Sequence, residues 1–241
     1  MDRRLLQPKW LLAHAGVLAI AVVFVQLGFW QLSRHQDRVE QNELGESRLG
    51  APVAQLDELL ASSGQVESFE FRRVEATGEY APDLEVLIRS RVHLGTAGFH
   101  VVTPLVGEGS EAVLINRGWI PLSMDQPPVA ARPPSGLVTV EGWVELSERK
   151  PPLGPEDPPE GVLDTLNRVD IDRIAQQLPM DVTPVYVVRI AEDGEELPIP
   201  VRQPAFDDQG PHLAYAIQWF GFAAVGLIGY FFLARRRLRS A

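Results

Sequence analysis

Two apolar runs of equal length, residues 10–30 and 213–233, lie near the two ends of the 241-residue chain. Each run has 21 residues and contains no Asp, Glu, Lys or Arg. A helix of this length measures roughly 31 Å at 1.5 Å per residue, which matches the hydrocarbon core of a bilayer. The sequence therefore predicts two transmembrane helices.

The basic residues near the two ends predict how the chain is oriented in the membrane. They lie on the terminal side of both runs, at Arg3, Arg4, Lys9, Arg235, Arg236, Arg237 and Arg239. Cytoplasmic flanks of membrane helices are enriched in Lys and Arg. We therefore expect cytoplasmic tails at residues 1–9 and 234–241 and an extracytoplasmic domain at residues 31–212.

A cleaved signal peptide is the alternative for the first run, because signal peptides also begin with basic residues. The run is longer than an ordinary signal-peptide core, and Trp30-Gln31-Leu32-Ser33 after it contains no small-x-small cleavage site. The run also starts at residue 10, which leaves no room for an organelle transit peptide. We expect an uncleaved anchor in a bacterial plasma membrane.

The predicted extracytoplasmic segment is strongly acidic. Residues 31–212 contain 15 basic and 31 acidic residues, which gives a net charge of −16. This charge argues against binding to nucleic acid or to anionic lipid surfaces. The excess of acidic residues is explained either by solubility or by an acidic patch that docks to another molecule. The chain has no cysteine and three methionines. Disulfides, thiol redox chemistry, CxxCH haem attachment and methionine-rich copper sites are therefore excluded.

The residue pattern between the two runs predicts an α+β domain. The first helix is expected to continue over residues 31–49, and a short helix is expected over residues 52–61. Apolar and polar residues then alternate, which is typical of strands. The expected strands are residues 69–80, 84–93, 98–106, 112–120, 137–146 and 185–190, with a helix capped by Asp170 over 171–178. We expect a mainly antiparallel sheet or open barrel with a few short helices.

No catalytic constellation appears in the sequence. The motifs G-x-S-x-G, G-x-G-x-x-G, H-E-x-x-H and the P-loop are absent, so we expect a protein that is not an enzyme. The five histidines show no metal-ligand spacing on one expected element; they are His14, His35, His93, His100 and His212. We expect His35 to be solvated, and His93 and His100 to be satisfied surface or core residues.

His212 differs from the other histidines because it lies immediately outside the second apolar run. Tyr215 and Trp219 follow it one and two helical turns further along. An imidazole with these aromatic neighbours has the chemistry to ligate porphyrin iron at the membrane edge. The alternative is an interfacial histidine in an aromatic belt, which is common at the ends of membrane helices.

Two other polar groups each have a functional and a structural interpretation. Trp30 and Arg34 lie four residues apart, so they share a helix face. They form either an interfacial anchor, or an aromatic platform with a cation for a propionate or a partner carboxylate. Asn116-Arg117-Gly118 interrupts an apolar strand, and we expect a bulge or turn with a paired arginine there.

Five short segments, in order along nearly the whole chain, carry a resemblance to a known family. They are Gly28-Phe29-Trp30-Gln31 with Arg34, Phe71-Arg72-Arg73-Val74 with Gly78-Glu79-Tyr80, residues 98–105, residues 116–119, and His212-Leu213-x-Tyr215 with Gln218-Trp219. Between two terminal spans, these segments make the chain resemble the Surfeit-locus-protein-1 family, also called Shy-type cytochrome oxidase assembly factors.

The resemblance implies a role in assembling haem-copper terminal oxidases, at the step where haem a enters the catalytic subunit. It implies cytochrome c oxidase subunits as partners and His212 as an axial ligand of haem iron. Trp30, Tyr215 and Trp219 would surround the haem, and Arg34 would pair with a propionate. The alternative is a scaffold that binds no haem and stabilises the oxidase or a respiratory supercomplex.

The chain departs from the family pattern at two places. His100 stands where relatives carry an aromatic residue, so it inherits no ligand role. His35-Gln36-Asp37 replaces the basic and aromatic residues that often follow the first arginine, which leaves Arg34 as the expected basic contact.

The depth of polar residues in the two spans predicts how the helices pair. Gln26 and Gln218 lie four and five residues inside the expected outer ends of their runs. Amides at matched depth in hydrocarbon need partners, so we expect them to bond each other or a common partner. The same argument places His14 near Gly229 and Tyr230.

Overall fold

The computed structural model describes residues 7–109, 111–190 and 197–239. Arg3 and Arg4, on which part of the predicted orientation depends, lie outside these residues. The chain divides into two compact units. One combines the N-terminal residues up to Leu44 with those from Ala205 onward, and the other is Gly45–Pro204. The compact β domain thus covers a shorter stretch of the chain than the predicted extracytoplasmic segment 31–212.

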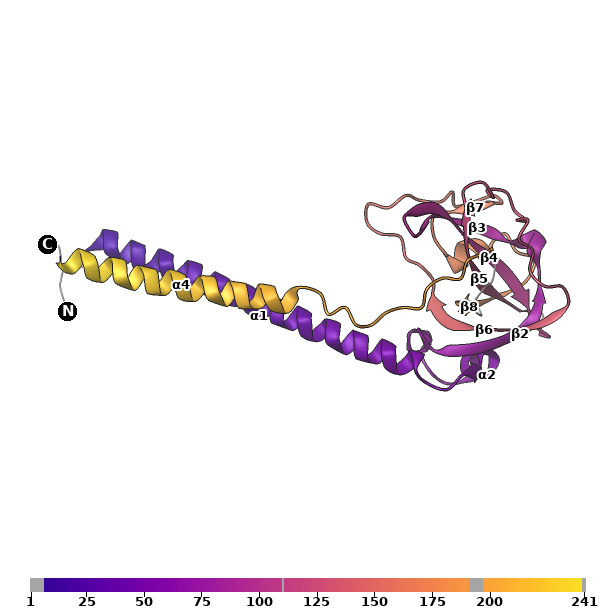
Figure 1. The fold of residues 1–241 in the computed structure, drawn as a ribbon, viewed down its shortest axis with the longest axis horizontal. Helices are drawn as coiled ribbons and strands as arrows, with labels where there is room; N and C mark the ends of the chain where they lie inside the picture. The colour runs from indigo at the N-terminus through magenta and orange to yellow at the C-terminus, as the bar shows by residue number, and fades with distance from the viewer. Residues whose placement is uncertain (1–6, 110, 191–196, 240–241) are drawn as a thin grey trace. The chain divides into compact units, whose positions relative to one another are not determined.

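Two long helices make up the first unit, as the two apolar runs predicted. Helix α1 spans Pro8–Leu49 and helix α4 spans His212–Arg239, and both are long and apolar enough to cross a membrane. They lie side by side and antiparallel (Figure 1), with contacts at both ends of the pair. The protein therefore has two membrane spans.

The packed face of α1 follows the spacing of a helix–helix interface. Its fully or partly buried positions include a series that recurs every three or four residues, at Trp10, His14, Val17, Ala21, Phe24, Gly28, Gln31 and His35. This spacing keeps one stripe of a helix against its neighbour. At Gly28 a Cβ atom would lie 2.7 Å from the Phe220 ring of α4, so any larger residue requires this ring to move.

One predicted polar pair between the spans is confirmed. The Tyr230 hydroxyl and the His14 Nδ1 atom lie 2.6 Å apart. The His14 and Tyr230 rings also meet edge to face, with centroids 5.4 Å apart. Matched depth in the two runs therefore predicted this contact correctly. It did so because His14 and Tyr230 also lie on the facing sides of their helices.

The predicted pairing of Gln26 with Gln218 is wrong. Both side chains are exposed, and no hydrogen bond joins them within the described residues. Gln26 lies two residues from the packed positions Phe24 and Gly28, and two residues turn a helix by roughly 200°. The depth of the two amides is matched, but each points away from the partner helix.

The second unit is a mixed sheet that closes into a barrel, which refines the predicted antiparallel sheet or open barrel. Eight strands lie in the order β1-β2-β6-β8-β5-β4-β3-β7, and an additional β2–β4 pairing joins the two sides. The strands are β1 (Ala54–Gln55), β2 (Arg73–Tyr80), β3 (Val86–His93), β4 (Thr96–Val106), β5 (Ala112–Pro121), β6 (Leu137–Leu146), β7 (Thr165–Leu166) and β8 (Val182–Arg189). Most pairings are antiparallel, but β1–β2, β3–β7 and β5–β8 are parallel.

Three apolar clusters hold this domain together, and the smallest contains Leu87, Val101, Ile120 and Val129. The first comes from β2, β4, β5, β6 and β8 and includes Val74, Leu105, Ile115, Val144 and Val187, with α2 (Leu56–Ala61) packed against it. The second lies on the other side of the strands, where Leu114, Trp143 and Tyr186 pack under α3 (Ile171–Ala175). Asp170 caps α3 as predicted, because its carboxylate accepts from the Arg173 N–H at 3.1 Å.

Several predicted boundaries shift in the structure. The predicted strand 69–80 begins only at Arg73, because Val66–Phe69 forms the 3₁₀ helix η2 and Phe69 is buried. The 3₁₀ helix η3 (Pro82–Leu84) precedes β3, and the predicted helix 52–61 begins at Leu56. The predicted helix 171–178 ends at Ala175. The two-residue strands β1 and β7 were not predicted, since a pattern of two residues has no detectable period.

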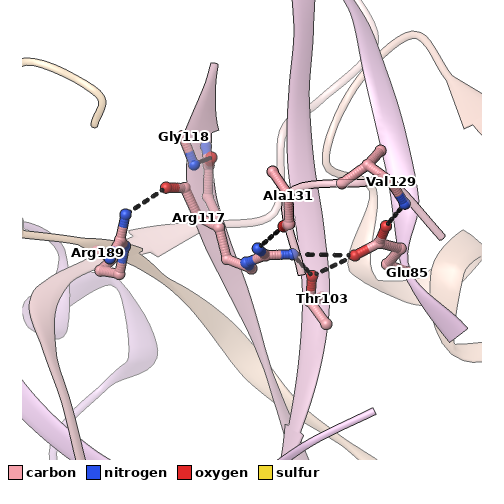
Figure 2. Close-up of polar contacts among 8 residues, drawn as sticks. Glu85, Thr103, Arg117, Gly118, Val129, Ala131 and Arg189 are labelled. Carbon is pink, nitrogen blue, oxygen red and sulfur yellow. Dashed lines mark hydrogen bonds and ion pairs between the residues drawn. The ribbon is translucent and has the colours of Figure 1, made fainter. Parts of the chain in front are cut away.

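The Asn116-Arg117-Gly118 interruption is a β-bulge with a paired arginine, as predicted. Val101 of β4 pairs with Gly118, but Val102 pairs with Asn116, so Arg117 is the extra residue. Its guanidinium is buried and lies 3.1 Å from Glu85, and it also donates to the Ala131 carbonyl (Figure 2). The opposite oxygen of Glu85 accepts the Val129 N–H at 2.5 Å.

The Arg117–Glu85 pair generates a stability prediction. Glu85→Ala leaves a buried guanidinium without its counter-charge, which should lower the free energy of unfolding by about 3–5 kcal/mol. Urea unfolding of the full-length protein in detergent, followed by near-ultraviolet circular dichroism, measures this loss. The double variant Glu85→Leu with Arg117→Met removes both charges and should cost markedly less. An equal loss in the single and double variants would contradict the ion-pair explanation.

Gly118 generates a second stability prediction. Its φ is +130°, and a Cβ atom would overlap the Ile199 carbonyl group. Gly118→Ala should therefore reduce the free energy of unfolding by at least about 2 kcal/mol. Gly95→Ala is the matched control, because Gly95 has φ +82° but no atom within 4 Å of an added Cβ. If the two substitutions cost the same in urea unfolding, backbone strain alone would explain both.

Candidate functional site

The predicted site residue His212 is the first residue of α4, where it faces α1. Its Nδ1 atom lies 2.9 Å from the Oε1 atom of Gln31. An amide oxygen only accepts hydrogen bonds, so Nδ1 is the donor in this contact and Nε2 is the ring nitrogen that it leaves for another partner. Histidines that bind a metal through Nε2 commonly donate Nδ1–H to an oxygen in this way.

The segment that leads into α4 lies along α1. The carbonyl oxygen of Asp208 accepts hydrogen bonds from Arg38 Nε at 3.3 Å and from Asn42 Nδ2 at 3.0 Å. The Asp208 side chain in turn accepts the Gly210 N–H at 2.8 Å, which forms a tight turn just before His212. These contacts hold the chain at the point where His212 enters the helix pair.

Trp30 and Arg34 form a local pair on α1. The Arg34 guanidinium lies 5.9 Å from the centre of the Trp30 ring and 3.7 Å from the Asp37 carboxylate. Trp30 is 52% exposed, and both members of the Arg34–Asp37 pair are more than half exposed. Exposed contacts of this kind contribute little to the free energy of folding, so the Arg34 side chain is free to rearrange toward an anionic group.

The other two predicted aromatic residues have different surroundings. Tyr215 is 46% exposed, one turn along α4 from His212. Trp219 packs within the helix pair, where its ring centroid lies 5.4 Å from Phe24 and 5.9 Å from Phe222. The structure thus brings His212 together with Gln31 and Trp30 together with Arg34. No hydrogen bond, ion pair or ring contact joins His212 to Trp30, Arg34, Tyr215 or Trp219 in the described part of the chain.

Gln31 is the residue that the sequence reasoning missed as a member of this site. It lies at the end of the first run, at the depth of His212 in the antiparallel pair. The depth rule that paired His14 with Tyr230 would also have selected it. The expected solvation of His35 is wrong, because its Nδ1 atom is buried and has no hydrogen-bond partner among the described residues.

The β-domain histidines have structural partners, as predicted. His100 Nδ1 lies 3.1 Å from the Asn116 amide, and burial together with the nearby Arg91 charge lowers the pKa of His100 to about 4. The His93 ring lies 5.4 Å from the Trp119 ring. Within the described residues, no three His, Cys, Asp or Glu side chains form a group that could hold a metal ion.

Comparison with known proteins places these features in a family. The sequence model of the SURF1 family matches residues 18–224. An uncharacterized SURF1-like protein of Mycobacterium bovis is 31% identical over 98% of this chain and 87% of its own length. SURF1-like proteins of Monosiga brevicollis and Rickettsia felis are 28% and 25% identical, over 92% and 93% of this chain and 87% and 97% of their own lengths.

The five segments that carried the resemblance lie at defined places in the structure. Gly28 and Gln31 contact α4, and His212 and Trp219 contact α1. The three middle segments belong to β2, β4 and β5 or the turn before β2. The chain belongs to the SURF1 family, whose members are cytochrome oxidase assembly factors.

Proposed function

We propose that this protein is a haem chaperone for cytochrome c oxidase that acts from a bacterial plasma membrane. Both termini are cytoplasmic in this proposal, and the β domain is extracytoplasmic, consistent with the basic residues after the second span. The protein assists haem a insertion into the catalytic subunit. The observation that carries the proposal is the hydrogen bond between His212 Nδ1 and Gln31 Oε1.

The residues present fit a haem because a porphyrin supplies four of its iron's ligands and needs only axial donors from the protein. His212 would be that donor through Nε2, because its Nδ1 atom faces Gln31 Oε1. The exposed Trp30 and Tyr215 offer apolar contact to the ring, and Arg34 offers a cation to a propionate. Trp219 supports the site indirectly, because its ring packs against Phe24. A bound haem would supply a redox-active iron centre that the catalytic subunit later uses.

A scaffold subunit without haem is the second candidate. The observation that favours it is that the His212–Gln31 contact also fastens α1 to α4, since a polar contact between helices stabilises their pairing in a membrane. Such a scaffold would stabilise the oxidase or a respiratory supercomplex by its spans and its acidic domain alone. The purified protein would then be colourless and still copurify with oxidase.

His212→Ala tests the haem proposal. The variant should lose the Soret absorption of protein purified in detergent from cells that make haem a, and oxidase yield should fall, because no axial nitrogen remains.

Gln31→Leu should lower haem affinity by roughly 10–100-fold, the usual effect of removing the partner that orients a ligating histidine. Arg34→Ala should have the smallest effect, since an exposed ion pair contributes about 0–1 kcal/mol.

The control is His93→Ala, which removes a histidine of the β domain and should retain the spectrum. Far-ultraviolet circular dichroism must show that all the variants are folded. A His212→Ala protein with an unchanged Soret band and normal oxidase yield would reject the haem proposal. A wild-type protein that copurifies with oxidase but binds no haem would establish the scaffold.

A further inference from the structure

A cavity of about 920 Å³ lies on the β domain, and the haem proposal gives it no role. Its floor comes from strands β5, β6 and β8, where Asn116, Trp143, Tyr186 and Val188 are all buried. Glu145, Glu148, Arg91 and His100 line its interior, and more exposed residues such as Arg149 and Arg202 lie at its rim. The cavity therefore combines an aromatic floor with ionisable groups.

Glu145 is in direct contact with the aromatic floor. It accepts the indole N–H of Trp143 at 2.9 Å, two residues before it on β6. Burial, with a smaller contribution from the nearby Glu70 and Glu148 charges, raises the pKa of Glu145 to about 7. The unfolding free energy therefore falls as the pH rises from 4.5 to about 7, because the unfolded chain releases this proton while the folded carboxyl retains it.

The cations near Glu145 are already engaged or lie at the surface. Arg91 donates to both oxygens of Glu148, at 2.6 and 2.8 Å. Lys150 at the rim pairs with Glu156 at 2.6 Å. His100 is neutral near pH 7, because its pKa is lowered to about 4. Burial raises the pKa of Tyr186, so this group too is neutral. Among the described residues, Glu145 thus has no ion-pair partner.

We propose that this cavity binds a guanidinium or ammonium side chain of a peptide segment in a partner protein. The cation would lie at the carboxylates of Glu70 and Glu145, above the floor that Trp143 and Tyr186 contribute to. Carboxylates supply the charge and hydrogen-bond acceptors that such a group requires. This binding does not depend on haem.

The size of the cavity favours a peptide over a free small cation. Its volume of about 920 Å³ leaves room for the segment that carries the charged side chain. The sequence between the two spans is strongly acidic, with 31 acidic and 15 basic residues in 31–212, which favours a cationic ligand. Complementary charge speeds the encounter with a basic segment and suppresses acidic competitors.

The experiment compares three probes on the full-length protein in detergent micelles. They are an acetyl-Gly-Arg-Gly-amide peptide, the same peptide with neutral citrulline in place of arginine, and butylguanidinium. Isothermal titration calorimetry should show that the arginine peptide binds at least about tenfold more tightly than the citrulline peptide, because one charge-assisted contact is worth about that factor. This comparison requires no variant of the protein.

The pH dependence and a substitution identify Glu145 as the group responsible. Affinity for the arginine peptide should rise about tenfold between about pH 6 and about pH 8, as Glu145 ionises with a pKa of about 7. Glu145→Gln should remove both this rise and the preference for arginine over citrulline. The matched control is Glu108→Gln, an exposed acidic residue beside another cavity, which should leave both unchanged.

Three results would overturn the proposal. They are equal affinity for the arginine and citrulline peptides, retention of the preference in Glu145→Gln, and no heat of binding at millimolar peptide. Butylguanidinium binding as tight as the arginine peptide would overturn the peptide assignment. Loss of haem from His212→Ala tests the proposed function separately, so the two ideas fail independently.

Discussion

The antiparallel packing of α1 against α4 is the constraint on which the arrangement of the membrane unit depends. In a bilayer the helices gain no hydrophobic energy from each other, so close contact between small residues and a few polar contacts must hold them together. Ala21, Ala216 and Ala223 are buried, and Gly28 allows the Phe220 ring to approach. The contacts His14–Tyr230 and Gln31–His212 lie toward opposite ends of the spans and define one register. That register also determines which nitrogen of His212 is available.

The β domain depends on a different interaction, the buried contact between Arg117 and Glu85. A bulge directs Arg117 into the interior, and its charge requires an acidic partner there because burial of an unpaired guanidinium is costly. Glu85 also binds the Val129 N–H, so the same carboxylate ties β5 to the loop after it. The family segment that contains Arg117 thus stabilises the fold. Among the residues that line the cavity around Glu145, only His100 and Asn116 belong to the family segments.

Much of this architecture could be predicted from the pattern of residues. Both spans, the continuation of the first helix to Leu49, the β6 boundaries and the Asp170 cap follow from local sequence, and the structure has all of them. Two failures in the helix pair share one cause. The Gln26–Gln218 pair and the His35 environment depend on which side of a helix faces its neighbour. Depth along a helix can be counted from the sequence, whereas the packed face of an almost uniformly apolar helix cannot.

The sequence by itself determined the two membrane spans, the acidic α+β domain between them, the family and the candidate histidine, because each depends on local composition, period or motif. Only the tertiary structure decided that Gln31 orients His212, that the β2–β4 pairing closes the sheet, and that Glu145 lies beside Trp143 and Tyr186 in one cavity. These features join residues up to 181 positions apart in the chain. Local propensity carries no information on such contacts, since they arise from the register and packing of whole elements.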